Sequence, residues 1–234
     1  MDSVERRTPD RKGLPSRSEA EIAILREGAA LADAGLLAAW GAIRAEASAA
    51  TVLDAVRTAI CDAGGETSPE VRIAHGLPLS LDEAAKPSPE LRAGELAWIR
   101  ISGVHRGFAY CGARQTSVGT PSDAARAYIA HLAETADWSI ESIEPGNRRR
   151  FVLTETRGRL LRVRGSGIGA QLEEPPEIEP NVWVEFAPQT VLHLEVSLAC
   201  DTFGTGSISD MILIGPEKVE RLKARFRSRD TPKP

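Results

Sequence analysis

Hydrophobic residues recur at spacings of three and four along the first third of the chain, and this is the period of an amphipathic helix. Ser18 and Glu21 form a capping box ahead of the first such stretch, which predicts a long helix. Thr51 and Asp54 repeat the device and predict a second helix that ends at the glycine pair 64–65. Two successive helices therefore open the ordered part of the chain.

A hairpin is predicted next. Leu96 to Ser102 and Gly107 to Val118 are β-compatible runs, and Gly103 to Arg106 lies between them as the turn. A third helix opens at Pro121-Ser122. The residues that share its apolar face are Tyr128, Ile129, Leu132 and Ala136.

The remaining segments alternate between strand-like and irregular. Strands are predicted at 151–163, 191–199 and 208–214, a last helix from Glu217 to about Arg227, and an extended loop over the Pro-, Ser- and acid-rich stretch 66–89. Helices that come first and hairpins mixed with single helices indicate an α+β fold rather than an alternating β-α-β chain.

Length and composition set the domain prediction. The chain has 234 residues, of which 42% are hydrophobic, enough to bury the core of one large domain. Residues 1–17 are polar and lack apolar periodicity, so they are predicted to form a disordered lead-in. We therefore expect a single domain over residues 18–227 and a short tail over 228–234.

Charge and cysteine content argue against several classes of protein. The net charge of −4 gives no general attraction to nucleic acid or to an anionic membrane, so we expect neither as a partner. No 18-residue apolar run and no signal peptide is found, which predicts a cytoplasmic location. Cys61, Cys111 and Cys200 are odd in number and widely spaced, as is typical of buried free thiols.

A run of arginines is followed by a run of glutamates. The arginines are Arg148, Arg149, Arg150, Arg157, Arg159, Arg162 and Arg164. The glutamates are Glu173, Glu174, Glu177, Glu179 and Glu185. A nucleic-acid site would interleave aromatic residues with the arginines, and only Phe151 lies among them. A solvated face on which the two blocks pair is the preferred interpretation.

The order of elements and several motifs resemble the creatinase, prolidase and methionine aminopeptidase family, which has the pita-bread fold. The segments that carry the resemblance are Ser18 to Gly28, Gly94 to Ile99, Gly107 to Gln115, Glu144 to Gly146 and Gly165 to Pro176. The last of these is rich in glycine, which indicates a close backbone approach. The resemblance covers about residues 18–226 and implies a curved antiparallel sheet covered by helices.

The resemblance also implies which residues replace the family's metal ligands. Enzymes of the family hold two divalent metals with two aspartates, a histidine and two glutamates. Matched one by one, these ligands fall on Arg100, Cys111, Ser166, Glu195 and Ser209. Only one of the five ligands, Glu195, is kept, and Arg100 would place a permanent cation in the site. No metal and no cofactor are therefore expected.

The altered pocket is predicted to bind an amino-acid-like carboxylate. Arg100 and Arg114 would grip the carboxylate, while Glu173 or Glu195 would meet an ammonium group or act as a base. A structural ion pair between Arg100 and Glu195 is the alternative. Ser166 and Cys111 would line the same pocket. Cys111 beside Arg114 could be an activated thiolate, although a packed strand cysteine is the preferred interpretation.

Two histidines complete the candidate set. His193 is two residues from Glu195, so the two side chains should share a face of a strand and could act as a base pair. His75 lies upstream, as a second catalytic histidine of the family does, and a solvated loop histidine is the alternative. Arg72 and Glu95 form with it a set worth testing, because a second resemblance, to the small bacterial Pictet–Spengler cyclases of β-carboline biosynthesis, implies an Arg, a His and a Glu in catalysis.

Three functions remain open from the sequence. The first is a metal-independent enzyme that acts on an amino-acid-like molecule, with condensation of a tryptophan-like amine and an aldehyde as its narrowest form. The second is a non-catalytic binding module, and the third is a metallopeptidase whose ligands lie elsewhere. A homodimer is expected in each case.

Overall fold

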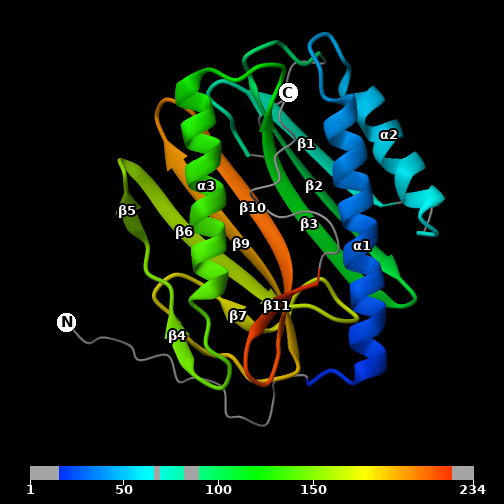
Figure 1. Ribbon diagram of the computed structural model, residues 1–234, viewed down its shortest axis with the longest axis vertical. Helices are drawn as coiled ribbons and strands as arrows, with labels where there is room; N and C mark the ends of the chain where they lie inside the picture. Colours follow the sequence, from blue (N-terminus) through cyan, green and yellow to red (C-terminus); the bar gives the residue numbers. More distant parts are fainter. Residues whose placement is uncertain (1–15, 66–68, 82–89, 223–234) are drawn as a thin grey trace.

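Two long helices cover separate parts of one face of an antiparallel sheet, and a shorter helix packs against the outer side of one of them (Figure 1). The computed structural model describes residues 16–65, 69–81 and 90–222. Helix α1 spans Glu19–Ala42, α2 spans Ala49–Asp62 and α3 spans Asp123–Glu141. Helix α1 packs on β2 and β3, α3 packs on β9 and β10, and α2 packs mainly on α1.

The sheet has nine strands, and the two-stranded β4–β8 ribbon lies apart from it. Seven strands follow the order β1-β2-β3-β10-β9-β6-β5, while β11 pairs with β10 and β7 pairs with β6. The bounds are β1 Glu70–Gly76, β2 Leu96–His105, β3 Phe108–Ser117, β4 Arg148–Arg150, β5 Thr154–Thr156, β6 Arg159–Gly167, β7 Glu174–Ile178, β8 Trp183–Glu185, β9 Thr190–Cys200, β10 Gly204–Ile214 and β11 Val219–Arg221. The α+β prediction is confirmed.

The helix starts follow local capping chemistry. The predicted capping box of α1 is present: Ser18 Oγ accepts from the backbone N–H of Glu21, and the Glu21 carboxylate accepts from that of Ser18. Helix α2 begins about one turn before the predicted position, because Ser48 Oγ accepts from the backbone N–H of Thr51 at 3.1 Å. Ser122 caps α3, as predicted.

Two hairpins turn at an Arg-Gly pair. Arg106 and Gly107 both have positive φ, 51° and 84°, and join β2 to β3. Arg157 and Gly158, at 49° and 70°, join β5 to β6. The turn of the first hairpin was predicted at Gly103 to Arg106, and the second was missed inside a continuous strand. The first position of such a two-residue turn is usually Asn or Asp. Because both turns have Arg there, the sequence pattern did not identify them as turns.

Two further predictions are wrong because pairing partners decide the outcome. The stretch predicted as a loop contains β1, an edge strand that pairs with β2 along its whole length. The predicted helix after Glu217 begins instead with β11, where Arg221 pairs with Ile212 of β10, and its remainder lies outside the described residues. Short strands of this kind depend on their neighbours more than on their own sequence.

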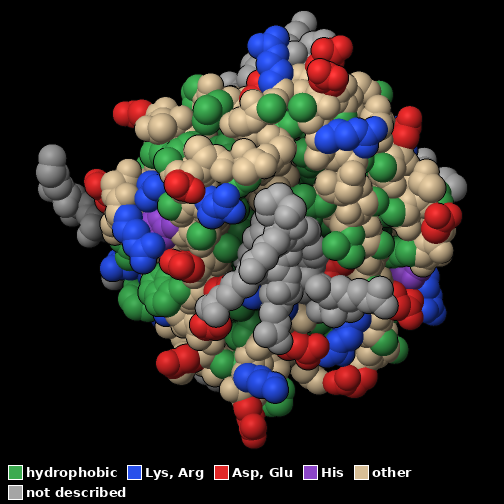
Figure 2. Space-filling model, turned by 45° about the horizontal axis from the view of Figure 1, so that its top comes forward, with side chains coloured by type: hydrophobic (Ala, Val, Ile, Leu, Met, Phe, Trp, Pro, Cys, Tyr) green, Lys and Arg blue, Asp and Glu red, His purple; other side chains and the backbone are tan. Residues whose placement is uncertain are grey.

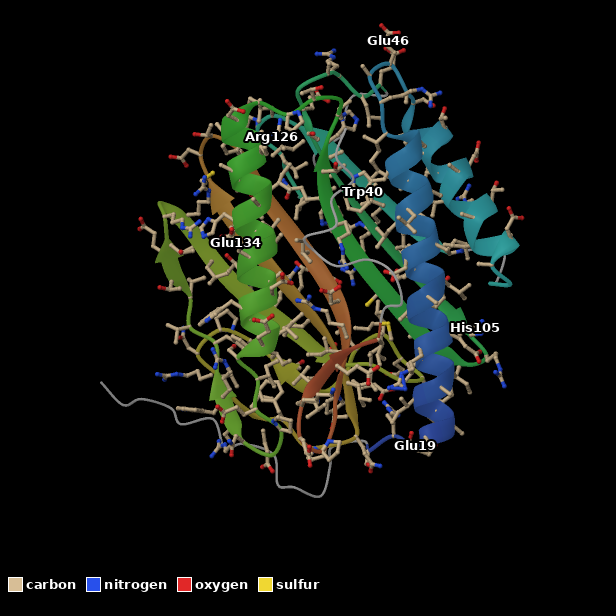
Figure 3. The ribbon with its side chains drawn as sticks, in the orientation of Figure 1. Glu19, Trp40, Glu46, His105, Arg126 and Glu134 are labelled. Carbon is tan, nitrogen blue, oxygen red and sulfur yellow. The ribbon has the colours of Figure 1, made fainter. Side chains whose placement is uncertain are left out.

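Helix α1 approaches the sheet closely at two glycines. A Cβ atom on Gly28 would lie 2.9 Å from Cβ of Tyr110, and one on Gly35 would lie 2.7 Å from a methyl of Ile101. At the hairpin tip His105 contacts this helix, with Nε2 3.0 Å from an oxygen of Glu27 (Figure 3). The helix thus lies flush on β2 and β3 and fixes them as one unit.

The arginine block is largely neutralised or stacked. Arg162 pairs with Glu179 at 3.1 Å, Arg148 lies opposite Glu185 in the β4–β8 register, and Arg149 lies over the ring of Phe151. On the face shown in Figure 2, acidic and basic side chains are interspersed. None of the helices in the described parts of the chain is long and apolar enough to span a membrane.

Candidate functional site

Four neighbouring strands bring three of the five matched ligand positions, Arg100, Ser209 and Glu195, into one row. Arg100 lies opposite Ala113, Ala113 opposite Ser209, and Ser209 opposite Glu195. Residues directly opposite in antiparallel strands point to the same face. Since a Cβ on the adjacent Gly112 would meet side chains of α1, this row points the other way. We call the sheet surface turned away from α1 and α3 the site face.

His193 and Ser209 form the closest polar contact of the site face. The Nε2 atom of His193 lies 2.6 Å from Oγ of Ser209, and both residues are buried. Burial, with a smaller contribution from the nearby guanidinium of Arg100 and against an opposing effect of Asp210, lowers the pKa of His193 to about 3. The imidazole is therefore neutral at ordinary pH, and its low pKa makes it a weak base, which suits hydrogen bonding better than proton abstraction.

Cys111 and Ser166 lie beside this pair. Burial raises the pKa of the Cys111 thiol to about 12, and the cation that opposes the shift is Arg100 rather than Arg114. The thiol therefore stays protonated and inert, so the packed-cysteine interpretation holds over the thiolate. Ser166 lies opposite His193 in the β6–β9 register and is buried. The positions matched to the family's ligands thus converge in space.

Glu195 does not pair with Arg100. Its carboxylate accepts from Arg164 Nη2 at 3.1 Å, and the side chain of Glu195 is 7% exposed while that of Arg164 is 47% exposed. The predicted Arg100–Glu195 ion pair is replaced by a cross-strand pair between β6 and β9. Arg164 was seen in the sequence only as one of the arginine block. Arg164 directly follows Val163, where the predicted strand ended, and extending that strand by a few residues would have placed Arg164 within it.

Arg100 is left as a half-buried cation. Among the residues the structure describes, no acidic side chain forms an ion pair with it. Arg72 lies directly opposite Arg100 in the β1–β2 register, which places two guanidinium-bearing residues side by side on the site face. Like charges in register are unfavourable unless an anion lies between or near them.

Three predicted residues lie away from the row. Arg114 points to the helix side of β3, where its guanidinium is buried and pairs with Asp210 at 2.5 Å. His75 lies opposite Ala97 on the helix side, and its Nδ1 is 2.8 Å from a carboxylate oxygen of Glu95. His75 and Glu95 thus contact each other, but they lie at the end of the β1–β2 strand pair on the helix side and do not line the site face.

The glycine-rich segment lets the backbone of β6 lie close to its neighbours. A Cβ on Gly165 would lie 2.1 Å from the carbonyl oxygen of His193, and one on Gly167 would lie 2.3 Å from that of Pro175. A Cβ on Gly169 would lie 1.9 Å from the guanidinium of Arg17. The close approach predicted from the glycines is thus to neighbouring strands and to one side chain.

Glu173 and Glu174 differ in a way the sequence did not show. Glu173 is exposed, whereas Glu174 is half-buried, forms an ion pair with Arg17 and accepts from the backbone N–H of Gln171. Arg17 also donates to the carbonyl of Ile168. This last residue of the predicted lead-in is therefore anchored in the segment, while residues 1–15 lie outside the described part of the chain.

The chain has the pita-bread fold, as comparison with solved structures shows. It aligns with a prolidase from Pyrococcus furiosus over 91% of its length and 66% of that chain, with a TM-score of 0.73 and 19% identity. It aligns with dipeptidase PepE from Mycobacterium ulcerans over 91% of its length and 60% of that chain, with a TM-score of 0.76 and 17% identity. It aligns with a methionine aminopeptidase from Thermotoga maritima over 89% of its length and 98% of that chain, with a TM-score of 0.73 and 16% identity.

The chain thus spans less than two thirds of the prolidase and of the dipeptidase. No protein-family model and no curated protein sequence matches it. At these identities the likeness establishes the fold alone.

The residues of the site face do not fit the metal pair that the family resemblance implies. Glu195 is the single carboxylate in the row, and His193 is engaged by Ser209. In the described ranges, no three His, Cys, Asp or Glu side chains are grouped as a metal would need. Two divalent ions would also have to lie close to the guanidinium of Arg100.

Proposed function

We propose that the protein binds a small carboxylate of amino-acid type on the site face, with Arg100 as its anchor and with no metal. The observation that carries this proposal is the half-buried Arg100 without an acidic partner in the described residues, beside the neutral groups of His193 and Cys111. A carboxylate would give that guanidinium a bidentate partner. Arg72 lies opposite Arg100 in the β1–β2 register.

An amino-acid-like ligand also carries an ammonium group. Glu195 carries the carboxylate in the row and would bind that ammonium group. Its ion pair with Arg164, whose side chain is half exposed, would then be partly broken. We assign any proton transfer to Glu195, because a pKa of about 3 makes His193 a weak base. Glu173, which is exposed, would contribute only if the segment that carries it closed over the ligand.

The narrowest form of the proposal is a Pictet–Spengler condensation. An amine and an aldehyde would lose water to form an imine, which is protonated on nitrogen. The aromatic ring would attack the imine carbon while the C=N π pair moves to the nitrogen, and Glu195 would take the proton that the ring then loses. Incubation with tryptophan and a small aldehyde, followed by mass spectrometry, tests it. Product above the uncatalysed rate that is lost in Glu195→Gln supports this form, and its absence removes it while leaving carboxylate binding to be judged separately.

The test of carboxylate binding uses calorimetric titration with a panel of amino acids, keto acids and small carboxylates. Loss of a charge-assisted contact should weaken binding of a responsive ligand by about 10- to 100-fold in Arg100→Ala. Arg162→Ala is the matched control, because Arg162 lies on β6 but pairs with Glu179. We expect the control to bind as the unsubstituted protein does.

The other two functions give different results in the same experiments. If no carboxylate binds, or if Arg100→Ala binds equally well, the site is not a carboxylate pocket and an interaction module is favoured. Two stoichiometric divalent metals in the purified protein would favour a metallopeptidase. A homodimer remains a prediction, which sedimentation of the same sample tests.

A further inference from the structure

Strands β3 and β10 lie next to each other but are paired in register at one position only. Ser209 and Ala113 are the single register pair between them, whereas β10 pairs with β9 and β3 pairs with β2 along their whole lengths. The sheet is therefore two well-paired halves joined at a narrow seam. One half carries Arg100 and Cys111, and the other carries His193, Ser209 and Glu195.

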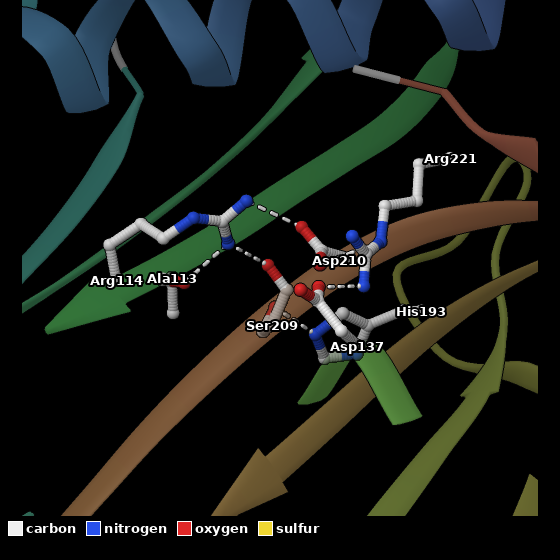
Figure 4. A network of polar contacts seen from close by, with 7 residues as sticks. All are labelled: Ala113, Arg114, Asp137, His193, Ser209, Asp210 and Arg221. Carbon is white, nitrogen blue, oxygen red and sulfur yellow. Dashed lines mark hydrogen bonds and ion pairs between the residues drawn. The ribbon is translucent and has the colours of Figure 1, made fainter. Parts of the chain in front are cut away.

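The guanidinium of Arg114 crosses this seam from the helix side. Its Nη1 donates to the carbonyl oxygens of Ala113 and Ser209, each at 2.7 Å, and its Nη2 donates to Asp210 Oδ1 at 2.5 Å (Figure 4). The two carbonyls belong to the seam's single register pair. Arg114 is 4% exposed, so these charge-assisted contacts are shielded from water.

The other polar contacts across the seam involve side chains, among them the hydrogen bond from Trp98 Nε1 to Ser207 Oγ at 2.8 Å. The backbone N–H of Cys111 finds a sulfur atom, Sδ of Met211 at 3.4 Å, in place of a strand carbonyl. A small cavity lies at the same place. Its polar lining includes Asp33, Cys111, Arg114, Ser209 and Asp210. Backbone pairing therefore contributes little to holding the two halves together here, and side chains carry most of the contact.

The contact continues outward through acidic and basic side chains. Asp210 also lies 3.5 Å from Nε of Arg221, and Nη2 of Arg221 lies 2.6 Å from Asp137 of α3 (Figure 4). Arg221 thus ties β11 and α3 to the same carboxylate. It does not touch the carbonyls of Ala113 or Ser209, which provides an internal comparison.

We infer that Arg114 is a positioning residue, which fixes the separation of the Arg100–Cys111 half of the site from the His193–Ser209 half. This inference rests on the proposed carboxylate site for its functional meaning. The guanidinium acts through the backbone of Ser209, on the opposite face from the ligand. Three donors in a fixed planar fork are needed, and a lysine cannot supply that geometry.

The test compares Arg114→Lys, Arg114→Met and Arg221→Met in a background with Cys61→Ser and Cys200→Ser, so that Cys111 is the only thiol. Alkylation of Cys111 reports opening of the seam, and the imidazole signals of His193 by NMR report its contact with Ser209. We expect both Arg114 variants to alkylate at least about tenfold faster, because local opening becomes easier. The His193 signals should shift toward those of a solvated ring.

Arg221→Met should lower the melting temperature but leave Cys111 protected and His193 unchanged. Should Arg114→Met not fold, Arg114→Lys carries the comparison, with far-UV dichroism as its check of folding. Unchanged alkylation and unchanged His193 signals in a folded Arg114 variant would overturn the inference. These readouts need no ligand, so a failure of carboxylate binding in the unsubstituted protein counts against the proposed function alone.

Where a carboxylate does bind, Arg114→Lys should weaken it although the variant keeps the charge. Equal affinity in Arg114→Lys and the unsubstituted protein, with the seam open by both other readouts, would show that the separation of the halves does not matter for binding. That result would overturn the positioning role while leaving the proposed function intact.

Discussion

His193 and Ser209 hold each other across neighbouring strands, with 2.6 Å between the imidazole Nε2 and the serine Oγ. Ser209 lies in the row of matched ligand positions, and His193 lies on the same face of the sheet, two residues from Glu195. Because the imidazole is buried and neutral, the pair satisfies two polar groups inside the sheet rather than offering a base to a substrate. A base for chemistry must come from Glu195 or from the ligand itself.

Replacing His193 by glutamine should flatten the acid limb of the stability curve. The folded-state pKa of His193 is about 3, well below the unfolded value near 6.5, so the unfolded chain takes up a proton between these values and the native state does not. Stability due to this group is therefore complete above about pH 6.5 and falls as the pH drops, by at most about 1.4 kcal/mol per pH unit. Urea unfolding of both proteins from pH 3.5 to 7.5 measures it, and parallel curves would contradict the neutral, buried imidazole.

The sequence predicts the fold and the place of the site better than it predicts the contacts inside it. Helical periodicity and capping residues are local, and the starts of α1 and α3 follow from them. The family motifs lead to the row of Arg100, Ser209 and Glu195 because they fix spacing along strands. Partners across strands depend on register and on which face a strand turns to solvent, and a single sequence does not specify either.

Arg114 and Glu195 illustrate this limit. Both were expected around one ligand, yet Arg114 faces α1 because it is three residues from Cys111 and strand side chains alternate. Glu195 meets Arg164, which lies on a strand whose extent was underestimated. Glu173 and Glu174 are adjacent in sequence, and the choice of which is held inside was settled by Arg17, a residue far away in the chain.

Tyr128→Phe should destabilise the protein by about 2 kcal/mol, because removal of the hydroxyl leaves two buried backbone groups without a partner. The hydroxyl donates to the carbonyl of Leu198 at 2.7 Å and accepts from the N–H of Gly206 at 2.9 Å.

Burial also raises the pKa of Tyr128 to about 12, above the ordinary value of 10.0. The unfolded chain therefore loses a proton first, and stability due to this group declines as the pH rises above about 10. Denaturant titrations at pH 8 and pH 11 measure both effects. A variant as stable as the original at pH 8 would contradict the bridging role.

His75→Gln should lower stability and leave ligand affinity unchanged. The His75 side chain is buried and contacts Glu95 at 2.8 Å on the helix side of the sheet, away from Arg100. Loss of a buried polar contact costs about 1–3 kcal/mol. Thermal unfolding, together with titration of any carboxylate that binds the unsubstituted protein, separates the two outcomes. A tenfold loss of affinity with unchanged stability would return His75 to the ligand site.

Gly169→Ala should be costly only while Arg17 is present. The added Cβ would lie 1.9 Å from the guanidinium of Arg17, which is held by Glu174 and by the carbonyl of Ile168. Arg17→Ala alone should cost about 2 kcal/mol, because it leaves Glu174 half-buried and unpaired. In the double variant the added Cβ no longer meets a guanidinium. The loss of unfolding free energy in the double variant should therefore be smaller than the sum of the losses in the two single variants.

Gly167→Ala is the matched control for this cycle. Its added Cβ would lie 2.3 Å from the backbone carbonyl oxygen of Pro175, which no side-chain truncation at residue 17 removes. Combined with Arg17→Ala, it should therefore give additive losses of unfolding free energy in urea titrations. Additive behaviour for Gly169→Ala as well would mean that Arg17 does not occupy the space above Gly169. The anchor that ties the start of the domain to the glycine-rich segment would then have to be another contact.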